Sequence, residues 1–144
     1  MPLVKLSDTL TPDLRRKLDC VARRAPILSR MGQSVKSLAQ RAFTDSALRA
    51  SDWAPRKKEP KDGHAILQDL KPLLRKSIRV ISVSEKEVVI GSDRPYAAAH
   101  QLGYAPRNLP ARPYLPFHAD GTLTPAAAAN VSSVLRAYLQ RAGL

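Results

Sequence analysis

The side chains best suited to bind a metal or to activate a nucleophile are three histidines and one cysteine: His64, His100, His118 and Cys20. None of the histidines has the His-x-x-x-His or His-x-x-Glu spacing that brings two ligands close together. A single cysteine excludes an internal disulfide and a cysteine-rich zinc site. The spacings therefore predict no metal site, and we expect Cys20 to be a small apolar residue of a helix.

Catalysis would centre on His100, which follows three alanines in the stretch "YAAAHQLG". A hydrolase needs a nucleophile and a base that orients it, but the chain has no Gly-x-Ser-x-Gly, P-loop or Gly-x-Gly-x-x-Gly motif. Asp93 and Asp120 stand beside turns, where aspartate is common for conformational reasons. We expect a packed imidazole near a helix C-terminus, whose dipole favours the cation. The chain is predicted to be neither an enzyme nor a cofactor-binding protein, and a nuclease or other hydrolase using His100 is kept as an alternative.

The charge of the chain indicates an acidic partner. The 144 residues carry 24 Lys and Arg against 12 Asp and Glu, a net charge of +12. The basic run "RKKEPK" supplies four candidate contacts to DNA or to another acidic partner: Arg56, Lys57, Lys58 and Lys61. The sequence has no zinc finger, basic zipper or convincing helix-turn-helix, and only 5% of its residues are aromatic. Non-specific binding to DNA phosphates is therefore an alternative function.

Length and hydropathy predict one domain over residues 1–144, because the chain is long enough to bury a core and is 44% hydrophobic. No apolar run approaches the length of a bilayer span, and the N-terminus lacks the apolar region of a signal peptide. We expect a soluble protein made in the cytoplasm, without a membrane partner.

The N-terminal third predicts a long helical region. Thr11 and Pro12 form a helix start, and Pro26 either begins a second helix or kinks the first. A stripe at helical spacing then extends the helix to near Ala50: Ile27, Leu28, Met31, Val35, Leu38 and Ala42. Gly32 is a weak point in this helix, since glycine costs up to ~1 kcal/mol relative to alanine.

The middle of the chain changes character at residues 51–65, where prolines, a glycine and the basic run predict a mobile loop. Trp53 is expected to bury its ring against the fold as an anchor. A short helix is predicted around Ile66–Leu70, limited by Pro72.

The C-terminal half mixes strands and helices. β-branched runs at 77–83 and 87–92 predict an antiparallel hairpin. A helix follows, with Pro95 in its first turn and Gly103 as its C-cap. Residues 113–117 alternate and are predicted to form an edge strand, and Thr124 with Pro125 begins the last helix.

These elements predict an α+β fold, in which a small antiparallel sheet packs against two or three helices, with a long N-terminal helical region and a C-terminal helix. Such a sheet has exposed edges, which favour oligomerisation.

Several ordered motifs then point to a family. The segments "AFTDSALRASDWAP", "ILQDLKPLLRKSI", "VVIGSDRPYAAAHQLG" and "LPARPYL" occur in that order. Over roughly residues 27–140 the chain resembles the virion-morphogenesis (tail-completion) family of Mu-like tailed phages. It departs from the family pattern on both sides of Trp53, where "RASDW" and "PRKKEPKDG" stand, and these departures affect the loop 51–65.

The resemblance implies a structural phage, prophage or tail-like-particle protein. It would complete the tail and join it to the head as a homo-oligomeric ring, a hexamer, at the neck of the virion, after synthesis in the host cytoplasm. Its partners would be other neck or tail proteins and, through phosphate contacts, the genome DNA. Six residues become the candidate structural motif or subunit interface: Tyr96, His100, Gln101, Gly103, Arg112 and Pro113. Arg112 is either an intersubunit or loop-to-helix anchor or a solvated loop arginine.

Overall fold

The computed structural model describes residues 12–58, 61, 63, 65–67 and 73–144, and it confirms the predicted α+β class. The elements are α1 (Pro12–Ala22), α2 (Ala25–Arg41), the 3-10 turn η1 (Ser46–Leu48), α3 (Leu73–Ser77), β1 (Arg79–Val83), β2 (Val88–Gly91), α4 (Ala97–Leu102), the 3-10 turn η2 (Ala105–Arg107) and α5 (Pro125–Arg141).

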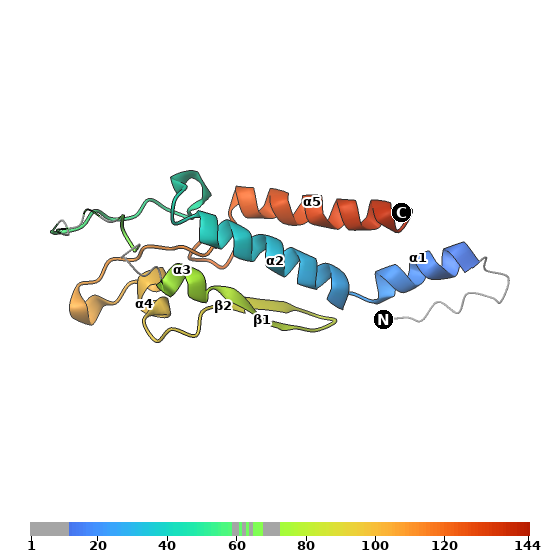
Figure 1. Ribbon diagram of the computed structural model, residues 1–144, viewed down its shortest axis with the longest axis horizontal. Helices are drawn as coiled ribbons and strands as arrows, with labels where there is room; N and C mark the ends of the chain where they lie inside the picture. Colours follow the sequence, from blue (N-terminus) through green and yellow to red (C-terminus); the bar gives the residue numbers. More distant parts are fainter. Residues whose placement is uncertain (1–11, 59–60, 62, 64, 68–72) are drawn as a thin grey trace.

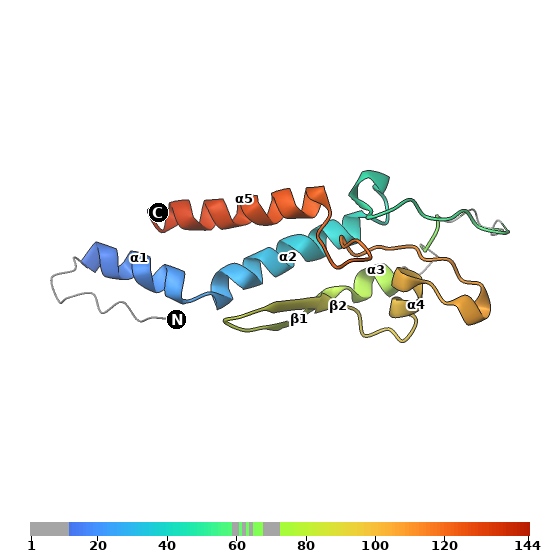
Figure 2. The same cartoon turned by 180° about the vertical axis from the view of Figure 1, so that it is seen from behind.

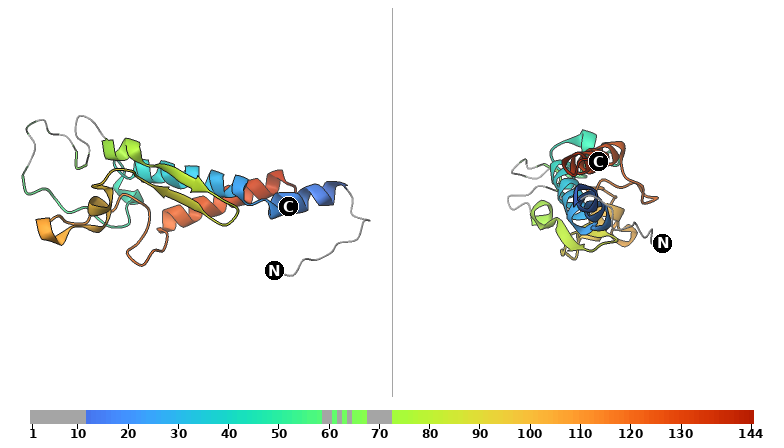
Figure 3. Two further views of the ribbon diagram at one scale, coloured as in Figure 1. Left: turned by 90° about the horizontal axis from the view of Figure 1, so that it is seen from below. Right: turned by 90° about the vertical axis from the view of Figure 1, so that its right-hand side faces the viewer.

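Helix α2 lies at the centre of the molecule. Helix α5 runs along one side of it, and the β1–β2 hairpin covers the other side (Figure 1 and Figure 2). Helix α1 continues beyond one end of α2, whereas α4 and its neighbouring loops lie at the opposite end (Figure 3). The molecule is therefore elongated along α2, with α1 at one end and α4 with its neighbouring loops at the other (Figure 1).

The predicted N-terminal helical region consists of two helices rather than one. Helix α2 begins at Ala25 and has Pro26 in its first turn, where the missing N–H of proline would have no helical partner. Of the two alternatives for Pro26, the start of a second helix is therefore confirmed. The Glu85 carboxylate, at the hairpin tip, accepts hydrogen bonds from the backbone N–H groups of Arg24 and of Ala25, the latter at 3.1 Å. A carboxylate at this position satisfies free N–H groups and interacts favourably with the helix dipole. The hairpin thus caps the helix on which it packs.

The predicted extension of this helix to Ala50 is wrong, because α2 ends at Arg41. The hydroxyl of Thr44 donates to the Arg41 carbonyl at 3.1 Å, and the Asp45 carboxylate accepts from the Ala47 N–H at 3.0 Å. Short polar side chains of this kind compete with the helical hydrogen bonds, so that the chain turns into η1.

The hairpin confirms the predicted antiparallel pair. Arg79 pairs with Gly91, Val80 with Ile90, Ser82 with Val89 and Val83 with Val88, and the register shifts between Val80 and Ser82. Ser77, predicted as the first strand residue, instead ends α3. Of the predicted helix at Ile66–Leu70, residues 68–70 lie outside the described residues, while Ile66 and Leu67 form a turn in which Leu67 has a φ of +61°.

Gly32 is the place where α2 touches the hairpin. A Cβ atom on Gly32 would lie 2.5 Å from a methyl group of Val88 and 3.3 Å from a methyl group of Val80. The glycine therefore permits close helix–hairpin packing, which the sequence alone presents only as a weak point.

We expect Gly32→Ala to lower the free energy of unfolding by up to about 2 kcal/mol. Overpacking against a stiff valine costs about 1–3 kcal/mol, which exceeds the ~1 kcal/mol that alanine gains in helix propensity. Urea unfolding measures the change, with Ser37→Ala on the exposed face of α2 as the matched control. A Gly32→Ala protein more stable than wild type would contradict this packing role.

Residues 113–117 do not form the predicted edge strand. Pro113 and Pro116 have no N–H to donate, and the N–H groups of Tyr114 and Leu115 bind a side chain of α4 instead of a strand. Among the described residues this part of the chain makes only one isolated bridge, between Phe117 and Leu123.

Helix α5 begins as predicted. Thr124 is its N-cap and its hydroxyl accepts from the Ala127 N–H at 3.3 Å. The helix is tied to α2 by a hydrogen bond between Ser34 and Asn130.

The hydrophobic core lies at the α4 end of α2. It joins seven buried residues from distant parts of the sequence: Ala39, Phe43, Trp53, Leu74, Ile78, Ala97 and Tyr114. The core therefore holds the start of the 51–65 segment, the hairpin base and α4 in one place.

Candidate functional site

Four of the six predicted motif residues meet at a junction that we call the α4 joint, formed by α4, residues 53–55 and residues 112–115. Gln101 lies at its centre. Its side-chain oxygen Oε1 accepts hydrogen bonds from the backbone N–H groups of Tyr114 at 3.0 Å and Leu115 at 2.9 Å. One amide oxygen thus fixes the path of a proline-rich segment that has no strand partner.

Trp53 closes the joint from the other side. Its indole N–H donates to the Pro113 carbonyl at 2.8 Å, and its buried ring meets Phe43 edge-on with a centroid distance of 5.7 Å. The guanidinium of Arg49 lies 3.7 Å from the ring centroid of Trp53, a cation–π contact. The tryptophan therefore links the end of α2 to residues 112–115.

Arg112 is buried and bonds to the loop that follows Trp53. Its Nε atom donates to the Ala54 carbonyl at 2.9 Å and its Nη2 atom to the Pro55 carbonyl at 3.2 Å. Burial, and then the charge of Arg56, lowers the pKa of Arg112. The alternative of a solvated loop arginine is wrong, because both bonds reach backbone atoms inside the same chain.

Gly103 ends α4 with a φ of +80°, a conformation that favours glycine. A Cβ atom there would lie 3.0 Å from the backbone nitrogen of Ala111 and 3.2 Å from the Leu109 carbonyl oxygen. The turn after α4 therefore needs a glycine for its conformation and for the close approach of residues 109–111.

His100 precedes Gln101 in α4 and belongs to the joint. Its ring meets Tyr96 edge-on at 5.9 Å, and its backbone carbonyl accepts from the Arg112 N–H at 2.7 Å. The Nδ1 atom is buried and has no hydrogen-bond partner within the described part of the chain. Burial, and then the charge of Arg112, lowers the pKa of His100. The imidazole is packed as predicted, but the pKa of His100 shifts in the direction opposite to the one that the helix dipole favours.

A folded-state pKa of His100 below the ordinary 6.5 makes the stability depend on pH. As the pH falls, the unfolded chain binds a proton at His100 before the folded chain does. The folded state therefore loses stability as the pH falls below about 6.5. We expect wild type to lose more stability than His100→Phe between about pH 8 and about pH 5. Urea midpoints at both values measure this, and an equal loss in both proteins would contradict it.

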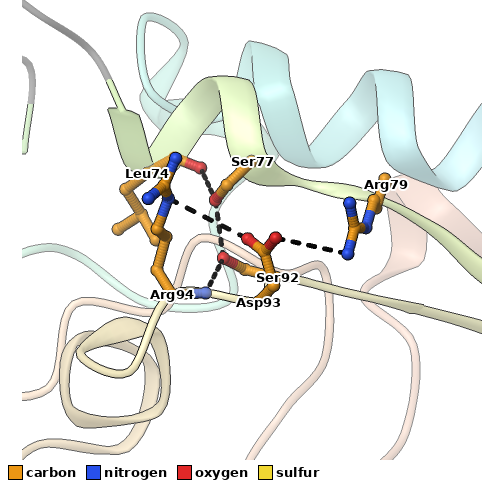
Figure 4. A network of polar contacts seen from close by, with 6 residues as sticks. All are labelled: Leu74, Ser77, Arg79, Ser92, Asp93 and Arg94. Atoms are coloured by element: carbon orange, nitrogen blue, oxygen red, sulfur yellow. Dashed lines mark hydrogen bonds and ion pairs between the residues drawn. The ribbon is translucent and has the colours of Figure 1, made fainter.

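A polar network fixes the chain between the hairpin and α4 (Figure 4). The Ser77 hydroxyl donates to the Leu74 carbonyl at 2.6 Å and is paired with the Ser92 hydroxyl at 2.5 Å. The Asp93 carboxylate lies 3.2 Å from Nη2 of Arg79 and 3.9 Å from Nε of Arg94. These contacts set where α4 starts relative to the sheet.

The predicted basic contacts are not brought into the joint as a group. Lys57, Lys58 and Lys61 are exposed, while Arg56 is half-buried near Arg112. Trp53, Ala54 and Pro55 are held by the bonds described above, so the predicted mobile loop does not include the first part of 51–65.

The described ranges contain no group of three His, Cys, Asp or Glu side chains that could hold a metal ion. Of the helices in the part of the chain that the structure describes, none is long and apolar enough to cross a membrane.

Sequence reasoning missed one residue of the joint, Tyr114, and two residues that pack against Trp53, Phe43 and Arg49. Tyr114 is almost fully buried, its hydroxyl donates to the Ala97 carbonyl at 3.3 Å, and burial raises its pKa. A large aromatic residue flanked by prolines was a usable signal for it, whereas nothing in the sequence marks Arg49.

The sequence pattern that defines the phage virion morphogenesis family matches residues 4–140. The chain belongs to the phage virion morphogenesis family. No curated protein and no solved structure matches it. The resemblance expected from "YAAAHQLG" and "LPARPYL" is confirmed, and the match also extends to α1. This virion morphogenesis protein therefore has a role in building a phage particle. The α4 joint contains most of the two motifs "YAAAHQLG" and "LPARPYL".

Proposed function

We propose that this protein completes the phage tail and joins it to the head, as a ring of identical subunits at the neck. Family membership supports a role in virion assembly. The observation that carries the proposal is the combination of a rigid inner side and an apolar outer side at the α4 joint. The proposed role is structural and needs no catalysis.

The inner side of the joint is held by directed hydrogen bonds. Gln101, Trp53 and Arg112 together donate to or accept from five backbone groups of neighbouring segments. A joint fixed in this way presents its outer surface in one geometry. Less conformational entropy is therefore lost when a subunit contact forms.

The outer side of the joint exposes large apolar residues. Leu102 is 75% exposed, Tyr104 47% and Tyr96 38%. Tyr96 and Tyr104 line a pocket of about 570 Å³ together with His100 and Arg107. Leu102 is the last residue of α4 and lines a neighbouring pocket with Gln101 and Leu115. Aromatic residues with a neighbouring arginine are typical of the centre of protein interfaces. We assign this surface to the contact between neighbouring subunits of the ring.

The hairpin offers a second contact. Its sheet has two strands among the described residues, so each strand has one edge without a strand partner there. Open edges pair readily with another chain, which suits a ring of repeated subunits or a neighbouring tail protein.

Leu102→Asp tests the proposal. A charge placed in the subunit contact should prevent ring formation while the subunit stays folded, because Leu102 is mostly exposed in the single chain. Native mass spectrometry measures assembly, and head–tail joining in a complemented deletion strain measures function. Ser132→Asp, which places the same charge on an exposed position of α5, is the matched control. A Leu102→Asp protein that assembles and joins particles like the control would refute this contact.

The net charge of +12 supports a second candidate function, non-specific binding to DNA. Filter binding of duplex DNA over a salt series measures it. A steep decrease in affinity with salt supports phosphate binding, and no binding by the free subunit at physiological salt argues against it.

A further inference from the structure

A shallow basic pocket lies where α3, β1 and the chain after β2 meet. Its volume is about 350 Å³, and it is lined by Leu73, Lys76, Ser77, Arg79, Asp93 and Arg94. Three of these side chains are cations and one is a carboxylate, so the pocket has a formal charge of +2. This is a local excess of positive charge in a small concave surface.

The two arginines are held in place by the carboxylate between them. Asp93 contacts Nη2 of Arg79 through one oxygen and Nε of Arg94 through the other (Figure 4). A guanidinium has five N–H donors, so each arginine keeps donors for a ligand. Their side chains are 59% and 45% exposed, respectively. The ion pairs therefore orient two guanidinium groups, each a fork of N–H donors, that remain open to solvent.

The serines hold the backbone under these arginines. The Ser77 hydroxyl uses its proton on the Leu74 carbonyl, so the Ser92 hydroxyl donates within the serine pair. Ser92 also accepts from the Arg94 N–H at 3.1 Å. The turn that carries Asp93 and Arg94 is thus fastened to the end of α3, next to Lys76.

We propose that this pocket binds a backbone phosphate of double-stranded DNA. Fixed guanidinium forks with a lysine beside them match the oxygens of a phosphate. None of the lining residues is aromatic, so the contact is independent of base sequence. An acidic protein is less favoured, since Leu73 is the one large apolar side chain in the lining and a protein interface has an apolar centre. The proposal rests on the second candidate function and names the site of DNA contact.

The test compares two variants that lose the same charge. One is the pocket variant Lys76→Gln/Arg79→Gln/Arg94→Gln. The control is Arg23→Gln/Arg136→Gln/Arg141→Gln, at exposed positions of α5 and of the link between α1 and α2. Binding of a duplex to each is measured over a salt series. We expect the pocket variant to bind about tenfold more weakly than the control at low salt, with a salt slope smaller by about one.

A charge-conserving variant distinguishes binding by the arginine geometry of the pocket from binding by overall positive charge. It also provides the test if the pocket variant does not fold. Arg79→Lys/Arg94→Lys keeps both charges but loses the forks, and we expect roughly threefold weaker binding than wild type. Wild-type affinity in this variant, or equal affinity in the pocket and control variants, overturns the pocket while leaving DNA binding intact. No binding of DNA by wild type overturns both the pocket and the second candidate function. Displacement of DNA by polyglutamate as readily as by competitor duplex identifies an acidic-protein site and also overturns the proposal.

Discussion

Replacing Gln101 by methionine is expected to lower the free energy of unfolding by about 2–4 kcal/mol. The side-chain oxygen of Gln101 accepts from two backbone N–H groups, at 3.0 Å and 2.9 Å. Methionine has a similar length but offers no comparable acceptor. A fully buried backbone donor left without a partner costs about 1–3 kcal/mol. Because both bonds are only partly buried, we expect the loss per donor to lie in the lower part of this range.

Gln101→Glu is the matched control for this substitution. A carboxylate keeps an oxygen in the same place and can accept both bonds, so this variant should unfold at a urea concentration much closer to wild type. If Gln101→Met and Gln101→Glu were equally stable, the two hydrogen bonds would not be what holds residues 113–117 in place.

Trp53→Ala should have the other large effect, a loss of about 3–5 kcal/mol. The substitution removes a buried ring, its contact with Phe43, the cation–π contact with Arg49 and the hydrogen bond to Pro113. Trp53 joins segments that are distant in the sequence, so the contacts between α2 and α5 cannot replace it. Urea unfolding measures the expected decrease in the free energy of unfolding.

Trp53→Phe separates the ring from its N–H group. The smaller ring retains most of the apolar contact but leaves the Pro113 carbonyl without its donor, at a cost of about 1–3 kcal/mol. A loss with Trp53→Phe as large as that with Trp53→Ala would mean that the hydrogen bond, and not ring burial, determines the stability of the joint.

The sequence predicted those elements whose signals are local. The hairpin follows from two β-branched runs, the end of α4 from Gly103, and α5 from Thr124 and Pro125. Each depends on residues within a few positions of one another, so propensity and capping were sufficient. Pro95, predicted in the first turn of α4, instead lies before its N-cap residue Tyr96.

The errors arose where a distant contact decides the local structure. Residues 113–117 alternate like a strand, yet an amide oxygen from α4 takes their N–H groups. Gly32 looks like a defect in a helix until the hairpin packs on it. A sequence-based argument gives His100 a cation favoured by the helix dipole, whereas burial and the charge of Arg112 lower the pKa of His100 in the fold.

The candidate site could be predicted only in part, for the same reason. Its residues were recognisable as a motif, but spacing could not show that Gln101, Trp53 and Arg112 bond to one another's segments. Arg49 carries no local signal at all, because its contact with Trp53 depends on the chain turning after Arg41.

The most direct test of the proposed role is electron microscopy of particles from a phage or prophage in which the gene is deleted. We expect complete heads beside unjoined tails of irregular length, and joined particles when the wild-type gene is supplied in trans. Leu102→Asp should fail to restore joining, while Ser132→Asp should restore it. Normal joined and infectious particles from the deletion would contradict the proposal that this protein completes the tail and joins it to the head.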